Sequence, residues 1–80
     1  MTQLMPAREA NLDCPAKVDA YLECIDLLTN GYFVVKQWFR KRSFDVYLRN
    51  FKNGHRIYVR YSYRSYYISK DGVIVKLKQY

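Results

Sequence analysis

The amino-acid sequence predicts an α+β fold in which one N-terminal helix packs on a four- to five-stranded antiparallel β-meander. Apolar residues recur with the three- and four-residue spacing of a helix up to residue 29, and with the two-residue spacing of strands from residue 32 to residue 78. Two dipeptides typical of hairpin turns, Asn53-Gly54 and Asp71-Gly72, divide this second region. The 80 residues are enough for one small domain with a modest core, but not for two domains.

The predicted helix covers residues 14–29. Asp13 or Cys14 is a suitable N-cap, and Pro15 fits the first turn, where an amide proton is not needed. Asn30-Gly31 predicts the C-terminal end of the helix, because glycine readily adopts the left-handed conformation of a helix stop. The spacing predicts an apolar stripe that faces the sheet, made of Val18, Tyr21, Leu22, Ile25 and Leu28. A second, acidic stripe is expected to face solvent and consists of Asp19, Glu23 and Asp26.

The predicted sheet spans residues 32–78. Its expected strands are rich in aromatic and β-branched residues and cover residues 32–39, 44–51, 56–63, 65–69 and 73–78. A basic turn, Arg40-Lys41-Arg42-Ser43, connects the first two strands. Alternation places one set of residues against the helix, namely Phe44, Val46, Leu48, Ile57, Val59, Tyr61, Tyr66, Ile68, Val73, Val75 and Leu77. The opposite set faces solvent and comprises Tyr47, Arg49, Phe51, Arg56, Tyr58, Arg60, Ser62, Arg64, Tyr67, Lys76 and Lys78. Tyr32, Lys36, Trp38 and Arg40 extend this solvent-facing set if the first strand pairs in the matching parity.

The charge of the chain is unevenly distributed. Residues 1–30 hold two basic and five acidic side chains, a net charge of −3, whereas residues 31–80 hold twelve basic and two acidic ones, a net charge of +10. A basic half of this kind attracts polyanions over a range that salt screening limits. The expected partner is therefore a nucleic acid or an acidic protein surface.

Arginine that alternates with tyrosine on an exposed sheet face suits nucleic acid in particular. Guanidinium groups contact phosphates and release counterions, while phenol rings offer stacking surfaces for unpaired bases, which favours a single-stranded partner. We expect phosphate contacts from Arg49, Arg56, Arg60 and Arg64, and base stacking on Tyr47, Tyr58 and Tyr67. Lys76 and the basic turn, with Arg40 and Arg42, are further candidate nucleic-acid-binding residues. The alternation carries no specific motif, and cross-strand aromatic pairs also stabilise exposed sheets without any ligand.

Two other functions compete with nucleic-acid binding. Tyrosine and arginine are enriched at protein–protein hot spots, so the chain could be a small inhibitor or adaptor of phage or mobile-element type that acts on a nucleic-acid-handling complex. An open edge on the first or the last strand also allows a homodimer. The third candidate is a metal-free ribonuclease, because RNA cleavage can use the 2′-hydroxyl of the substrate.

The ribonuclease hypothesis draws on two resemblances. The stretch "GHRIYVRYSYRSYYISKDGVIVKL", residues 54–77, resembles in strand and turn texture the terminal hairpins of RelE/ParE-type bacterial toxins. The helix followed by "NGYFVVKQWFRKRSFDVYL" is similar to the start of HicA-type toxins. The first family places a strand before its helices, which this sequence does not predict. The second carries a Gly-Ser-His turn where Arg40–Ser43 stand here.

Little else in the sequence supports catalysis, so a non-enzymatic protein is the favoured prediction. His55 is the single histidine and a weak catalytic candidate. No metal or cofactor is expected, because the basic half offers only Asp45 and Asp71 as carboxylates, and one histidine cannot complete a usual zinc set with Cys14 and Cys24. Both cysteines are expected to be reduced structural thiols.

Residues 1–12 have weak periodicity and contain Pro6, so we expect a flexible N-terminal arm ahead of a single domain over residues 13–80. The first residues show neither a basic nor an apolar segment of the kind that directs secretion. The longest uncharged run, Leu27–Val35, has nine residues and is too short to span a bilayer. We expect a cytoplasmic protein without a membrane partner.

Overall fold

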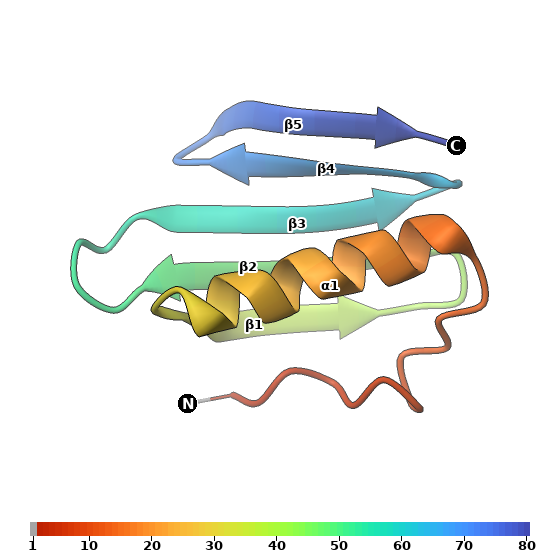
Figure 1. Ribbon diagram of the computed structural model, residues 1–80, viewed down its shortest axis with the longest axis horizontal. Helices are drawn as coiled ribbons and strands as arrows, with labels where there is room; N and C mark the ends of the chain where they lie inside the picture. The colour runs from red at the N-terminus through yellow and green to blue at the C-terminus, as the bar shows by residue number, and fades with distance from the viewer. Residues whose placement is uncertain (1) are drawn as a thin grey trace.

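The computed structural model describes residues 2–80 and confirms the predicted α+β meander (Figure 1). One helix precedes five strands: α1 (Pro15–Thr29), β1 (Tyr32–Phe39), β2 (Ser43–Asn50), β3 (Arg56–Ser62), β4 (Ser65–Lys70) and β5 (Val73–Gln79). The strands form one sheet in chain order, and every neighbouring pair is antiparallel. Cys14 is the N-cap of α1, and Asn30 is its C-cap.

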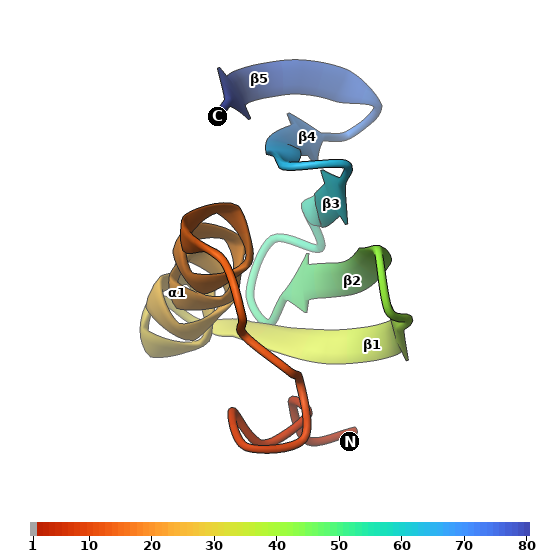
Figure 2. The same ribbon diagram turned by 90° about the vertical axis from the view of Figure 1, so that its right-hand side faces the viewer.

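The molecule has two layers, with α1 lying across one face of the sheet (Figure 2). The buried core lies between them and takes side chains from the helix and from the first four strands. The expected core residues of β2, β3 and β4 are all buried, namely Phe44, Val46, Leu48, Ile57, Val59, Tyr61, Tyr66 and Ile68. No element of residues 2–80 covers the opposite face of the sheet, which we call the outer face.

The face that α1 turns to the sheet differs from the predicted stripe. Its fully buried positions are Ala16, Ala20 and Cys24, whereas Leu22 and Ile25 are 56% and 41% exposed. Small side chains at the centre of the contact let the helix axis approach the sheet closely, and the larger residues then fall on its flanks. The predicted stripe was therefore wrong for Leu22 and Ile25, because apolar spacing alone counts alanine as a weak core residue.

Two β-bulges change which residues face outward on the edge strands. The β1–β2 register shifts at Val35, so Tyr32 lies on the helix side, where it packs against the core, while Lys36 and Trp38 lie on the outer face. The β4–β5 register shifts at Val75, which turns Leu77 to the outer face. The expected helix-side position of Leu77 was wrong, and of the β1 residues placed conditionally on the outer face Tyr32 does not lie there, since one extra residue in a strand inverts the alternation beyond it.

Lys76 and Lys78 are a further correction caused by the bulge at Val75. They pair with Ile68 and Tyr66, so they lie on the helix side and not on the outer face. Lys76 Nζ is 2.7 Å from Glu23 Oε1, and Lys78 Nζ is 3.5 Å from Asp19 Oδ2. The predicted acidic stripe of α1 is thus partly an anchor for β5, and the ion pair with Glu23 raises the pKa of Lys76.

Two tight turns connect the last three strands. Asp71 and Gly72 have φ angles of 50° and 86°, the left-handed conformation that a type I′ hairpin turn requires and that the sequence predicted. Tyr63 and Arg64 adopt positive φ angles of 49° and 67° in the β3–β4 turn. Arg64 therefore lies in a turn rather than on the outer face, contrary to the prediction from alternation.

The N-terminal segment runs beside β1 (Figure 1). Thr2 forms an isolated antiparallel bridge with Val34. The Gln37 side chain accepts a hydrogen bond from Met5 N at 2.8 Å and donates one to the Gln3 carbonyl at 2.6 Å. The free edge of β1 is thus partly covered by residues of the same chain.

Candidate nucleic-acid interface

The outer face carries most of the residues that the sequence singled out. Cross-strand register and alternation place on it Phe33, Lys36, Trp38, Ser43, Asp45, Tyr47, Arg49, Arg56, Tyr58, Arg60, Ser62, Ser65, Tyr67, Ser69, Ile74 and Leu77. Tyr47 lies opposite Tyr58, Arg49 opposite Arg56, and Arg60 opposite Tyr67. Six of the predicted site residues are therefore cross-strand neighbours on one surface.

Two of the predicted stacking residues stack on each other. The Tyr47 and Tyr58 rings are parallel to within 7°, with centroids 4.6 Å apart. Each ring covers one face of the other, so an unpaired base can reach only the remaining face of each. The Tyr47 hydroxyl accepts a hydrogen bond from Arg49 Nη2 at 3.1 Å, which positions that exposed guanidinium beside the ring pair.

Arg60, which was expected to contact phosphate, is occupied by partners within the sheet. Its Nε and Nη2 donate to the two Asp45 carboxylate oxygens at 2.7 and 3.4 Å, and its Nη1 donates to the Tyr67 hydroxyl at 3.3 Å. The hydrogen bonds to Asp45 raise the pKa of the guanidinium. We interpret Arg60 and Tyr67 as a cross-strand tie of the sheet rather than as ligand contacts.

A hollow of about 380 Å³ opens beside this tie, at the end of the sheet near the basic turn. It is lined by Trp38, Arg40, Ser43, Asp45, Tyr58 and Arg60. Trp38, the single tryptophan of the sequence, is 47% exposed. The sequence placed Trp38 on this face only conditionally, because the parity of β1 depends on a bulge that no local pattern marks.

The remaining predicted residues lie around or away from this surface. Arg56 is at its far end, with Nε 3.9 Å from Asp71 Oδ1. Arg42 and Arg64 line a different hollow of about 310 Å³ with Cys14, Lys17 and Tyr61, near the start of α1. Lys76 is on the helix side with Glu23. Of the predicted set, the structure therefore separates Arg42, Arg64 and Lys76 from the outer face.

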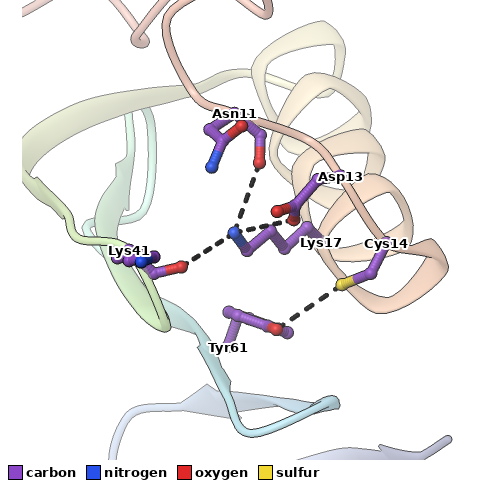
Figure 3. Close-up of polar contacts among 6 residues, drawn as sticks. All are labelled: Asn11, Asp13, Cys14, Lys17, Lys41 and Tyr61. Carbon is purple, nitrogen blue, oxygen red and sulfur yellow. Dashed lines mark hydrogen bonds and ion pairs between the residues drawn. The ribbon is translucent and has the colours of Figure 1, made fainter.

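Lys17 is a buried lysine near the second hollow, and sequence reasoning did not single it out. Only 3% of its side chain is exposed, and its ammonium donates to the carbonyls of Lys41 at 2.9 Å and Asn11 at 3.3 Å (Figure 3). It also lies 2.9 Å from Asp13 Oδ1, and its hydrogen bond lowers the pKa of that carboxyl group. One side chain thus links the start of α1 to the β1–β2 turn.

The two cysteines are both free thiols, as expected, but their surroundings differ. Burial raises the pKa of Cys24 to about 12. Partial burial also disfavours the Cys14 thiolate, but hydrogen bonds from Tyr61 and from the backbone N–H groups of Lys17 and Ala16 outweigh it, so the pKa of Cys14 is lowered. The Cys14 sulfur lies 3.5 Å from the Tyr61 hydroxyl oxygen (Figure 3).

His55 occupies the loop between β2 and β3, where its backbone N–H donates to Asn53 Oδ1 at 2.9 Å and its carbonyl accepts from Asn50 N at 2.8 Å.

In residues 2–80, no three His, Cys, Asp or Glu side chains gather in a way that could hold a metal ion. Within the same residues, no helix has the length and apolar character needed to cross a membrane.

Comparisons with protein-family models, with curated protein sequences and with solved structures find no match for this chain.

Proposed function

We propose that this protein binds single-stranded nucleic acid through the outer face of its sheet. The observation that carries this proposal is the hollow in which the half-exposed Trp38 indole lies beside Arg40, next to the Tyr47–Tyr58 ring pair. An exposed aromatic ring offers a stacking surface to an unpaired base, and neighbouring cations neutralise the phosphates on either side of it.

Contacts within the sheet alter the role that we propose for some of the predicted residues. Because Arg60 and Tyr67 are hydrogen-bonded within the sheet, we assign the phosphate contacts to Lys36, Arg40, Arg49 and Arg56. Base stacking falls to Trp38, with Tyr58 lining the same hollow. Trp38 and Tyr58 both lie on the open outer face of the sheet. Such a surface suits a flexible single-stranded nucleic acid better than a rigid duplex.

Trp38→Ala is expected to weaken binding of single-stranded RNA or DNA by about tenfold, since base–aromatic stacking contributes about 1–3 kcal/mol per base. The measurement is fluorescence anisotropy with labelled oligonucleotides at physiological salt. The matched control is Tyr80→Ala, because Tyr80 is also 47% exposed but lies at the chain end with its ring under Lys78. Quenching of the single tryptophan in the unmodified protein should follow the same titration. Equal oligonucleotide affinities of Trp38→Ala and the unmodified protein would contradict the stacking role of Trp38.

Arg49→Gln is expected to reduce the slope of log affinity against log salt concentration by about 0.7 for a single-stranded ligand. Lys76→Gln is the control, because Lys76 is on the helix side and paired with Glu23, so its removal should leave the slope unchanged. A smaller slope for Lys76→Gln than for Arg49→Gln would place the phosphate-binding surface on the helix side instead.

The same titrations separate the competing functions. Binding that disappears at physiological salt, with no preference among single-stranded RNA, single-stranded DNA and duplex DNA, would favour an acidic protein as the partner. That second candidate has its own support, because Trp38, Arg40 and Tyr58 are the residue types enriched at protein hot spots. Cleaved RNA on a gel from the same samples would favour the ribonuclease.

A further inference from the structure

The last strand is the most exposed element of the molecule. All seven residues of β5 are exposed, and four of them are aliphatic: Val73, Ile74, Val75 and Leu77, each between 57% and 65% exposed. β5 is also an edge strand, with β4 on one side only. A strand in this position offers unpaired backbone N–H and C=O groups together with apolar side chains.

The two edges of the sheet differ in how far other residues cover them. The edge of β1 is partly covered by the N-terminal segment through the Thr2–Val34 bridge and the hydrogen bonds of Gln37. Beside β5, in contrast, Figure 1 shows no other segment of residues 2–80 along the outer edge. The fold therefore leaves only this one of its two edges without a cover among the described residues.

Charge does not protect the β5 edge either. Lysines on an edge strand normally discourage pairing with another strand, because two like charges would meet. Here Lys76 and Lys78 are drawn back to the helix of their own chain by Glu23 and Asp19. Two copies of β5 can therefore approach with their lysines already neutralised.

We propose that two copies of the chain associate through antiparallel pairing of β5 with β5, which joins their sheets into one. The bulge at Val75 makes the strand self-complementary, because it puts Ile74 and Leu77 on the same face although they are three residues apart. A two-fold axis between residues 75 and 76 then sets Ile74 of each copy against Leu77 of the other. The same register sets Val73 against the aliphatic stem of Lys78 on the helix side.

This association is independent of nucleic-acid binding and is tested by sedimentation equilibrium between about 1 and 200 μM, a range chosen for a small interface of modest affinity. The unmodified chain should shift from monomer to dimer across this range. Ile74→Lys should weaken dimerisation at least tenfold, because it places a new charge at the centre of the pairing. The control is Phe51→Lys, which changes an apolar residue that is 73% exposed in the loop between β2 and β3. Circular dichroism verifies that both variants are folded.

A second measurement tests the register. In a chain whose native thiols are removed by Cys14→Ser and Cys24→Ala, the double change Ile74→Cys and Leu77→Cys should yield a covalent dimer on oxidation, since directly opposed residues lie within disulfide reach. A chain that stays monomeric up to 200 μM overturns the proposal. So does a dimer that Ile74→Lys does not weaken. A dimer that Ile74→Lys weakens, but that the paired cysteines do not cross-link, overturns the register.

Discussion

Replacing Lys17 with methionine is expected to lower the free energy of unfolding by about 2–4 kcal/mol, because the buried ammonium group is hydrogen-bonded to two backbone carbonyls and to a carboxylate. Methionine fills a similar volume but donates no hydrogen bond. The carbonyls of Asn11 and Lys41 would lose a donor that links the start of α1 to the β1–β2 turn (Figure 3). The measurement is urea unfolding of both proteins, followed by circular dichroism.

Asp13→Asn is the matched control for this prediction. The Asp13 side chain is 60% exposed, so water replaces much of what its pairing with Lys17 supplies, and the loss of stability should be clearly smaller. In Lys17→Met, the pKa of Asp13 should also return toward its ordinary value, which NMR titration of the carboxyl group measures. If Asp13→Asn destabilises the protein as much as Lys17→Met does, the ion pair and not the two carbonyl contacts holds this junction.

Lys17 also shows where sequence patterns stop being informative. A lysine in the first turn of a helix is almost always solvated, and nothing in the local pattern marks this one as buried. Its partners include the carbonyl of Lys41, which lies 24 residues away along the chain. Only the packing of the β1–β2 turn against the start of α1 brings these atoms together, so no local spacing could have predicted the contact.

The fold itself could be predicted because its signals are local. Cys14 and Pro15 mark the start of the helix, and Asp71-Gly72 adopts the positive φ angles that its composition predicts. The core of β2, β3 and β4 follows simple alternation. Besides the helix stripe and Arg64, the errors lie on β1 and β5, where the bulges at Val35 and Val75 each add one residue to a strand without a glycine or proline to signal it.

The sequence could predict on which face of the sheet the candidate residues lie, but not which contacts each of them makes. Alternation placed Tyr47, Tyr58 and Arg60 on the uncovered face, and the register confirms that placement. Their pairing within the sheet depends on which residue lies opposite, which the sequence leaves open. The Asp45–Arg60 pair follows from one particular register of β2 and β3, and a shift of the pairing would have left Arg60 without its carboxylate partner.

The second large effect is expected at the helix–sheet contact, where Ala20→Leu should lower the free energy of unfolding by about 2–3 kcal/mol. Ala20 is fully buried and belongs to the core cluster with Ala16 and Cys24. A leucine there has no space unless α1 moves away from the sheet, which would loosen the core on both sides of it. Thermal and urea unfolding measure this loss.

Leu22→Ala makes this prediction specific to one face of the helix. Apolar spacing assigns Leu22 to the core, so that assignment predicts a loss of several kcal/mol on truncation, about 2–5 kcal/mol for a buried leucine. The structure shows Leu22 more than half exposed, so the loss should stay below about 1 kcal/mol. The two assignments therefore predict opposite orders for the stability losses of the two variants. A well-tolerated Ala20→Leu together with a strongly destabilising Leu22→Ala would mean that α1 is rotated about its axis. The reverse order of effects is expected, because the small residues, and not the large ones, set how closely the helix approaches the sheet.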